Sequence, residues 1–595
     1  MSLVVSTPPH ANAAPPDRTV QEIITEARVR QQAARGGAPF RNGLVLSVST
    51  AVLLWLSFMP VNFSPLAWIA PVPLMLLVRL VQPTRRMYVA CYLGGLAFFL
   101  PALQWMRLGD PAMYLAWGLL AAYLAFSFPI FVAVTRVAVH RFGVPLAIAA
   151  PAVWVGLDYA KAHVMTGFAW YFLAHTQYRW LELIQISDLV GAYGVTFVMA
   201  LAAAALAGVV PECWFQFPKP GFAVIPPRIT PVFVSLAVCI AVLGYGFVRR
   251  HQAIFEAGPR VALIQGNFIA SLRIPDEDYN KTFQTHLKLT AYAVREQPDV
   301  IIWPEGMVRW PLMSAPPELS AEELRQREPR VPPDLWRDTG IRDALVRESQ
   351  RTGAAMIYGI ECVDLSDDGL RTSNSAVFVR PDTGVAGRYD KIHLVPFGEY
   401  LPFQRALPWL IHFTPYPAGF GLTPGQHAAV FEYRNWRMAP VICFEDTVPH
   451  LVRQIVGADG HRERPVDLIV NLTNDGWFRG SSELDQHLIT AAFRAVECRT
   501  PVVRAVNTGI SAVIDGDGAI LDPDVFIDGD NQGRKTARDP KTGRWHKQLN
   551  AAVVQTVPLD PRSSLYVLCG DWFAMLCAAA TLFWTGGAWF RRRAS

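Results

Sequence analysis

The sequence predicts two parts of different character, a set of membrane-embedded helices and an α/β domain that faces water. Only 17% of the 595 residues are charged, whereas a soluble protein usually carries about 25%. The deficit is local. Residues 43–248 hold 10 basic and 5 acidic residues, about 7% of 206 positions, while residues 249–570 hold 36 and 40, about 24% of 322. This division excludes a single soluble globule.

Apolar runs fill the first part, and one more follows the second. Seven precede residue 249 and an eighth lies near the C-terminus: 43–59, 65–80, 87–106, 112–137, 144–158, 191–210, 232–248 and 572–590. Several reach the roughly 20 residues that cross a hydrocarbon core about 30 Å thick. The run over 144–158 is short enough to need tilt or re-entry. Because backbone polar groups must be paired inside lipid, these runs are expected to be helices.

The distribution of Lys and Arg predicts the orientation of these helices. With the N-terminus inside, the inner segments carry 14 basic residues and the outer segments 5, although Arg249 and Arg250 fall on the outer side. Seven crossings then place the charged block outside the cytoplasm. The expected parts are a disordered cytoplasmic tail over 1–41, a seven-helix transmembrane domain over 42–248, an extracytoplasmic domain over 249–565, and an eighth transmembrane helix with a short cytoplasmic tail over 566–595.

Apolar strand-like runs and helical stretches alternate in the extracytoplasmic domain. The expected strands are 261–265, 300–303, 355–360, 375–379, 438–443, 468–472, 502–507 and 511–514. The expected helices are 281–295, 343–352, 448–456 and 484–498. This alternation predicts a layered α/β fold. A charged stretch rich in Gly and Asp over 523–550 is expected to be a surface loop.

Several function classes are disfavoured by composition. The block over 249–570 has a net charge of −4, so it has no excess of positive charge with which to bind nucleic-acid phosphates. The eight cysteines show no metal-ligand spacing, and no Gly-rich phosphate loop is present. We therefore expect no metal, no cofactor and no nucleic-acid partner.

Three polar residues stand at the ends of apolar strand-like runs: Glu305, Lys391 and Cys443. Each has a simple explanation alone, a buried structural thiol for the cysteine and a surface charge for the other two. Together they would supply a nucleophile, a carboxylate to take its proton and a cation beside a developing oxyanion. A neighbouring lysine would also favour the thiolate. This set of groups suits acyl transfer through a thioester.

Longer motifs around these residues resemble the nitrilase superfamily. They are VIIWPE with Glu305, RYDKIHLVPFGEYLPF with Lys391, PVICFED with Cys443, and NLTNDGWF with Asn474 and Asp475. With eight apolar runs around them, the chain is similar to the apolipoprotein N-acyltransferases of the bacterial cytoplasmic membrane. Further motifs carry this narrower resemblance: VALIQGN over 261–267, GFAWYFLAHTQ over 167–177, QISDLVGAYGVTF over 185–197 and RTPVVRAVNTGISAVID over 499–515.

The resemblance extends over 43–590 and implies a multi-pass α-helical membrane domain joined to an α/β, nitrilase-like, four-layer αββα sandwich. It implies that Glu305 is the general base, that Lys391 stabilises the oxyanion and that Cys443 is the acylated nucleophile. The positions that it implies for support or substrate binding are Glu399, Glu445, Phe444, Gln265, Asn267 and Asn474, with the backbone N–H of Phe444 available to the oxyanion.

The reaction implied by the resemblance has two halves. Cys443 takes an acyl chain from a membrane phospholipid, and the thioester is then attacked by the amine of a diacylglyceryl-cysteine lipoprotein. The enzyme would be a monomer of the bacterial inner membrane with its catalytic domain on the periplasmic side. Two alternatives remain open: a membrane-tethered amidohydrolase that uses water as the acceptor, and a non-catalytic lipoprotein-binding scaffold.

Some positions depart from the pattern of the family. Arg273 and Ile274 stand where a Lys-Trp pair is common, and Gly306 and Met307 replace a small polar pair after WPE. All four are expected on loops near the substrate entrance. Outside the motifs, His393 is expected to be structural or a loop contact. A packing or capping role on an amphipathic helix is expected for His487.

Overall fold

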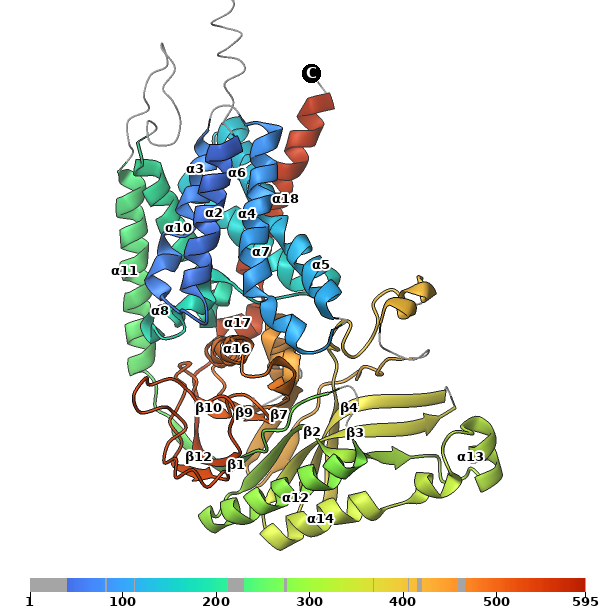
Figure 1. The fold of residues 1–595 in the computed structure, drawn as a ribbon. Helices are drawn as coiled ribbons and strands as arrows, with labels where there is room; N and C mark the ends of the chain where they lie inside the picture. Colours follow the sequence, from blue (N-terminus) through green and yellow to red (C-terminus); the bar gives the residue numbers. More distant parts are fainter. Residues whose placement is uncertain are drawn as a thin grey trace, which may run out of the picture.

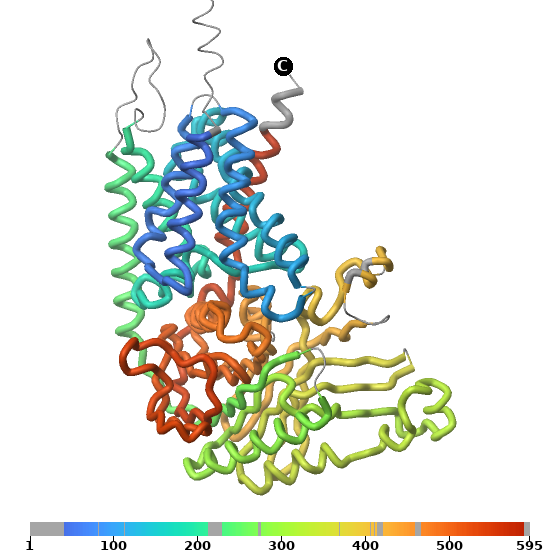
Figure 2. The backbone as a smooth tube through the Cα atoms, viewed as in Figure 1, coloured from blue at the N-terminus to red at the C-terminus, as the bar shows by residue number. Residues whose placement is uncertain are grey.

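The computed structural model describes residues 40–80, 83–111, 113–211, 229–271, 275–367, 369–404, 406–414, 420–457 and 466–593. A bundle of helices occupies one end of the molecule, and two β-sheets with their covering helices occupy the other (Figure 1). The same view as a tube shows the chain running from the bundle into the sheets and back (Figure 2). Nearly all of the predicted disordered tail, and the departures at Arg273 and Ile274, lie outside the described residues.

Each apolar run of the sequence contains helix. The long helices of the bundle are α2 (Phe40–Ser57), α4 (Arg85–Ala102), α5 (Met113–Ala125), α6 (Ser127–Phe142), α7 (Leu146–His163), α10 (Ala192–Val209), α11 (Thr230–His251) and α18 (Trp572–Arg593). Within the described residues, three helical stretches are long and apolar enough to cross a membrane, namely Met113–Phe142, Ala192–Val209 and Thr230–His251.

The run over 65–80 differs from the single helix expected there. It forms a 3-10 turn (Ser64–Trp68) and the eight-residue helix α3 (Val72–Arg79), because Pro71 and Pro73 lack the N–H groups that a continuous helix needs. Arg79 ends α3 and donates to the carbonyls of Ala207 and Val210 at 2.6 Å each, at the end of α10.

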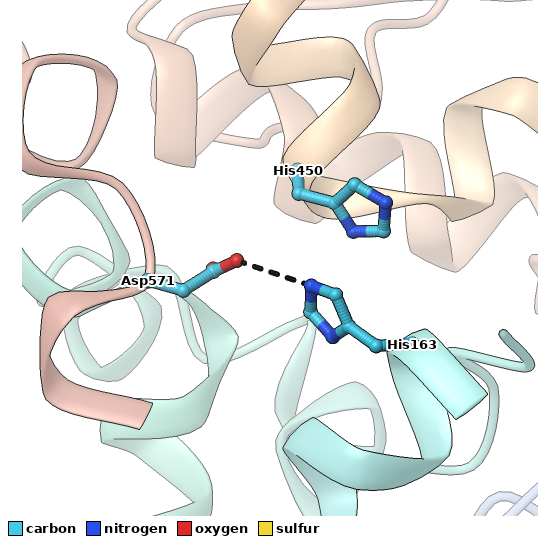
Figure 3. A group of neighbouring side chains, drawn as sticks. All are labelled: His163, His450 and Asp571. Carbon is cyan, nitrogen blue, oxygen red and sulfur yellow. Dashed lines mark ion pairs between the residues drawn. The ribbon is translucent and has the colours of Figure 1, made fainter. Parts of the chain in front are cut away.

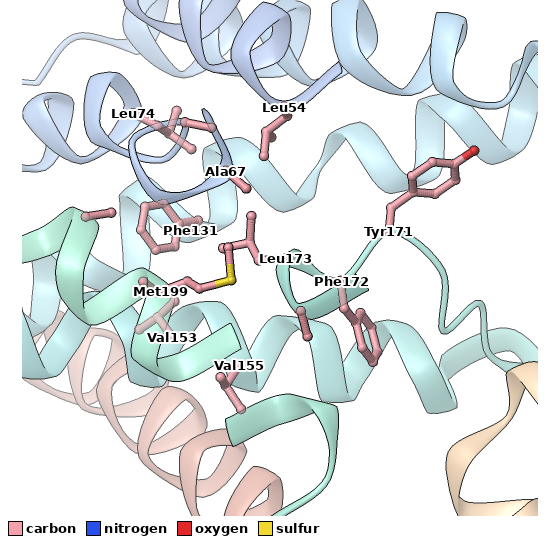
Figure 4. Packing of buried hydrophobic residues seen from close by; sticks show 14 of the residues in the cluster. Leu54, Ala67, Leu74, Phe131, Val153, Val155, Tyr171, Phe172, Leu173 and Met199 are labelled. Atoms are coloured by element: carbon pink, nitrogen blue, oxygen red, sulfur yellow. The ribbon is translucent and has the colours of Figure 1, made fainter. Parts of the chain in front are cut away.

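One apolar core fills the bundle. Its interior contains side chains that are at most 3% exposed, such as those of Leu54, Leu74, Phe131 and Met199 (Figure 4). The core also takes in Ile489, Phe493 and Val496 from α16 (Glu483–Cys498), which belongs to the sheet-containing part. The bundle and the sheets are therefore packed together through a shared helix.

The first sheet has the strand order β11-β12-β1-β2-β3-β4-β5. Its strands are β1 (Glu256–Gln265), β2 (Val300–Ser314), β3 (Ala355–Ser366), β4 (Gly369–Arg380), β5 (Gly384–Asp390), β11 (Val525–Asp528) and β12 (Ala551–Leu559). Helices α12 (Asp276–Ala293) and α14 (Gly340–Thr352) cover its outer face, and α13 (Ala321–Arg327) lies at its edge. The predicted loop over 523–550 was partly wrong, because β11 within it pairs with β12.

The second sheet has the order β10-β9-β8-β7-β6. Its strands are β6 (Phe431–Tyr433), β7 (Trp436–Ile442), β8 (Leu468–Thr473), β9 (Val502–Val506) and β10 (Ala512–Ile514). Helices α15 (Pro449–Gly457) and α16 cover its outer face, on the side of the bundle.

Alternating side chains along the strands produce the layers. Val261 and Leu263 of β1 face the second sheet, whereas Ala262 and Ile264 face α12. Because both faces of such strands are covered, they read as continuous apolar runs in the sequence. The predicted αββα sandwich is confirmed. Each of the eight predicted strands overlaps an observed strand, although the ends differ.

Polar residues join the bundle to the sandwich. Arg499, fully buried after α16, donates to Asp188 at 2.7 and 2.9 Å and to Gln185 at 2.6 Å. Asp188 lies in α9 (Ser187–Val190), which follows α8 (Leu181–Ile184). Arg249 at the end of α11 also donates to Asp188, at 2.8 Å. Asp188 and Gln185 therefore connect the two parts of the molecule in addition to packing within the bundle.

Candidate active site

Glu305 lies in a bulge of β2 and not at the end of a strand. The register between β2 and β3 shifts between Trp303 and Val308, and Gly306 has a φ of 65°. A Cβ on Gly359 of β3 would lie 2.3 Å from the carbonyl oxygen of Pro304, so this glycine lets the bulge approach β3. Gly306 and fully buried Met307 are therefore parts of β2, and their predicted position on a loop was wrong.

Lys391 directly follows β5 and is held between two carboxylates. Its side chain is 1% exposed, and its Nζ lies 2.9 Å from Glu399 and 3.5 Å from Glu305. The amide of Asn374 on β4 donates to both carboxylates, at 2.7 Å to Glu305 and 3.0 Å to Glu399. The other oxygen of Glu399 accepts from the backbone N–H of Val395 at 2.7 Å. These contacts fix the two carboxylates and the ammonium group relative to one another.

Cys443 follows β7 in a tight turn. It has a φ of 52°, in the left-handed region that non-glycine residues rarely adopt, and a 3-10 turn (Cys443–Thr447) follows. Its thiol lies close enough to Glu305 and Lys391 for both charges to shift its pKa. The structure thus brings together the three residues that the sequence singled out, from the ends of β5 and β7 and the bulge of β2.

The protonation states differ from the thiolate expected beside a lysine. Burial, and then the Glu305 carboxylate, raise the pKa of the Cys443 thiol well above its ordinary value and outweigh Lys391. Burial also raises the pKa of Glu305, against the opposite effect of Lys391. Although burial alone would lower the pKa of Lys391, the carboxylates of Glu399 and Glu305 raise it. The resting site therefore holds a neutral thiol near Glu305, with the fixed cation of Lys391 beside them.

Glu445 braces the turn after Cys443. Its fully buried carboxylate accepts from the Tyr389 hydroxyl at 2.9 Å and from the backbone N–H groups of Ile392, His393 and Ile442 at 2.7–2.9 Å. These bonds tie the segment after Lys391 to the segment before Cys443. His393 also stacks on Phe444, with ring centroids 5.9 Å apart, and has the structural role predicted for it.

A second layer of buried charge, which sequence reasoning missed, lies behind Cys443. His487 of α16 pairs with Asp446 at 2.9 Å and with Asp475 at 2.8 Å, and Arg504 of β9 pairs with the same two carboxylates at 2.6 and 3.3 Å. All four side chains are at most 2% exposed. Burial and Arg504 lower the pKa of His487, but Asp446 and Asp475 outweigh them and raise it to about 10. His487 is buried on its helix, as a packing role requires, but the ion pairs of its ring were not predicted.

The remaining predicted positions lie around the segment 507–511. Gln265 donates to the Gly509 carbonyl at 3.0 Å, and the backbone N–H of Asn267 donates to the Asn507 carbonyl at 2.9 Å. The side chain of Asn474 accepts from Asn507 at 2.8 Å. These three residues hold the loop after β9, whereas Phe444 packs where the bundle meets the sandwich.

Asp475, Glu483 and His487 also place ligand atoms close together, which raises the question of a metal ion there. Both ring nitrogens of His487 already face carboxylates, and its raised pKa keeps the ring protonated. A protonated imidazole offers no lone pair to a metal. In this cluster the imidazolium and the guanidinium of Arg504 supply the positive charge.

The comparisons of sequence with known proteins identify one family. Family models for the apolipoprotein N-acyltransferase N-terminal domain and for carbon-nitrogen hydrolase match residues 50–205 and 260–528. A solved amidase from Nesterenkonia sp. is 15% identical, covers 52% of this chain and 93% of its own, and has a TM-score of 0.32. Apolipoprotein N-acyltransferases are more similar in sequence. That of Rhodopirellula baltica is 29% identical (92% of this chain, 98% of that protein), and that of Geobacter metallireducens is 36% identical (81% and 86%). The chain belongs to the apolipoprotein N-acyltransferase family.

Proposed function

We propose that the chain transfers an acyl chain from a membrane phospholipid to the N-terminal amine of diacylglyceryl-cysteine lipoproteins, through a thioester on Cys443. The observation that carries the proposal is the meeting of Cys443, Glu305 and Lys391 on a sandwich packed against an apolar bundle. Membership of the family agrees with it.

In the first half of the reaction, Glu305 takes the thiol proton as the sulfur attacks the ester carbonyl of the phospholipid. The Lys391 ammonium and the Phe444 backbone N–H stabilise the oxyanion. The C–O bond then breaks, and Glu305 returns the proton to the oxygen of the departing lysophospholipid.

In the second half, the lipoprotein amine attacks the thioester carbonyl and gives its proton to Glu305. The C–S bond breaks, an amide is left on the lipoprotein, and the sulfur regains its proton. Glu399 and Glu445 keep the lysine and the cysteine turn in place, while Gln265, Asn267 and Asn474 hold the loop over 507–511 beside the site.

The same proposal places the helices in the bacterial inner membrane and the sandwich on its periplasmic side. Seven crossings over 42–248 precede the catalytic domain over 249–565, and the crossing over 566–595 follows it. Two features support this arrangement. The helices α2 and α18 respectively begin and end at the end of the bundle remote from the sheets (Figure 1). Arg249 and Arg250, which oppose the charge bias, are paired with Asp188 and Glu182. The enzyme acts as a monomer in this scheme.

Intact-mass measurement of the purified protein incubated with phospholipid tests the function. We expect a covalent acyl adduct that is absent in Cys443→Ala and that a diacylglyceryl peptide discharges with formation of an amide. Discharge to free fatty acid at the same rate with and without the peptide would show a hydrolase. No adduct under any condition would leave a binding scaffold.

A further inference from the structure

Three side chains that the proposed reaction does not use converge where the bundle meets the sandwich. His163 is the last residue of α7, His450 lies in the first turn of α15, and Asp571 directly precedes α18 (Figure 3). One ligand atom from each lies within 4.8 Å of the other two. The Nε2 atom of His163 is 3.8 Å from Oδ2 of Asp571, and the two imidazole rings stack with centroids 4.3 Å apart.

The surrounding hydrogen bonds leave the facing atoms available. Nδ1 of His163 lies 2.9 Å from the Tyr159 carbonyl, which can only accept, so this nitrogen carries the proton and Nε2 keeps its lone pair in the neutral ring. The Tyr566 hydroxyl donates to Oδ1 of Asp571 at 2.6 Å and orients Oδ2 toward His163. Among the described residues, the buried Nδ1 of His450 has no hydrogen-bond partner.

These contacts resemble the outer bonds of protein metal sites. A metal-binding histidine usually donates its second ring nitrogen to a carbonyl or carboxylate, as His163 does to Tyr159. Two imidazole nitrogens and one carboxylate oxygen form a common three-residue set for zinc, with a fourth position open to water. The cluster at His487 differs, because there both ring nitrogens are donors and Arg504 supplies charge.

We propose that His163, His450 and Asp571 bind a zinc ion that joins α7, α15 and the start of α18. A tetrahedral site with bonds of about 2.1 Å places neighbouring ligands roughly 3.4 Å apart, so the ligand atoms close in by at most about 1.4 Å. The two stacked rings also turn out of their parallel arrangement, so that both in-plane lone pairs point at the ion. Both histidines are half-buried, which leaves the ion a path of entry. Since α15 follows the turn that begins at Cys443, bound zinc fixes that turn against the bundle.

Zinc binding to the full-length protein in detergent tests the proposal. After treatment with a chelator and its removal, calorimetric titration with zinc chloride should show one site per chain, and cobalt chloride should give the visible absorption of a tetrahedral Co²⁺ site. His163→Ala, His450→Ala and Asp571→Asn should each weaken binding at least about tenfold. The matched control is His251→Ala, because this histidine is exposed on α11 outside the cluster.

A second readout separates loss of the site from loss of the fold. The wild-type protein should melt at a higher temperature with zinc than without it, and the three variants should show no such rise. Each variant must elute as a single species in size-exclusion chromatography. If His450→Ala does not, His450→Gln takes its place. No stoichiometric zinc binding by the wild type, or binding unchanged in all three variants, overturns the proposal. Either result leaves acyl transfer by Cys443 untouched.

Discussion

At the scale of single residues, the backbone of Cys443 is itself part of the site. The backbone of a non-glycine residue is strained at a φ of 52°, and such strain persists only where the surrounding structure imposes it. Glu445 imposes it from one side by four hydrogen bonds, and His487 contacts the Cys443 carbonyl at 3.3 Å from the other.

Replacement of the nucleophile tests the thioester directly. Cys443→Ser should lower the rate of acyl transfer by roughly 10³-fold or more, because Glu305 cannot deprotonate an alcohol as it does a thiol. The measurement is amide formation on a diacylglyceryl peptide, with Cys569→Ser as the control, since this cysteine is exposed on α17 (Leu565–Cys569). Substantial turnover by the serine variant would contradict the mechanism.

The charge of His487 gives a prediction for stability against pH. Its pKa is raised from 6.5 to about 10 in the fold, so its contribution to stability is complete below pH 6.5 and is lost as pH rises toward 10. We expect the free energy of unfolding to fall over this range by up to about 1.4 kcal/mol per pH unit. Thermal melts of the protein in detergent at several pH values measure the slope.

His487→Gln should remove that slope and also slow formation of the Cys443 adduct, since the turn loses a contact to its carbonyl. His286→Gln is the control, because His286 is equally buried on α12 away from Cys443. An unchanged pH slope in His487→Gln would assign the titration to another group.

At the scale of elements, Gly359 on β3 shapes the position of Glu305 on the neighbouring strand β2. Gly359→Ala should push the bulge of β2 away, because the new methyl group would meet the Pro304 carbonyl at 2.3 Å and the Glu305 Cα at 2.5 Å. We expect a loss of about 1–3 kcal/mol in stability and a rate lower by about 10²-fold. Gly118→Ala on α5, which has open space around it, should keep full activity. Equal behaviour of the two variants would show that the close approach has no role.

The same bulge marks a limit of sequence reasoning. Glu305 and Cys443 could be found because each adjoins an apolar run, and such runs signal strands buried on both faces. Lys391 instead follows the mostly half-buried strand β5, so the motif around it was the useful signal there. The bulge of β2 could not be predicted from the sequence, since it depends on Gly359 of the neighbouring strand. His487, Asp446 and Arg504 come from three elements whose contacts are tertiary. No local pattern marks such a set, although Asp475 stood in a recognised motif.

At the scale of the whole molecule, buried ions hold the bundle against the sandwich. Removing one partner of a buried pair leaves the other charge uncompensated, which costs about 3–5 kcal/mol. Asp188→Asn or Arg499→Met should therefore lower the melting temperature of the protein in detergent markedly. The double variant should lose less than the sum of the two single losses.

A surface pair supplies the comparison for this prediction. Arg380 and Asp382 lie 2.5 Å apart, with 33% and 55% of their side chains exposed, so Arg380→Met should leave the melting temperature nearly unchanged. A similar effect of Arg380→Met and Arg499→Met would mean that the junction is not held by these charges.

The pairing of β1 with β12 has a consequence for how the chain is assembled during synthesis. Glu256 at the start of the sandwich pairs with Leu559 at its end, about 300 residues later, and β12 lies inside the sheet between β11 and β1. The edge of β1 therefore stays open until nearly the whole block has left the ribosome, and exposed strand edges invite pairing with other chains. Closing the sheet also returns the chain to the bundle, where α18 packs against α7 and α6, so the last helix can enter the bundle only when the sandwich is complete.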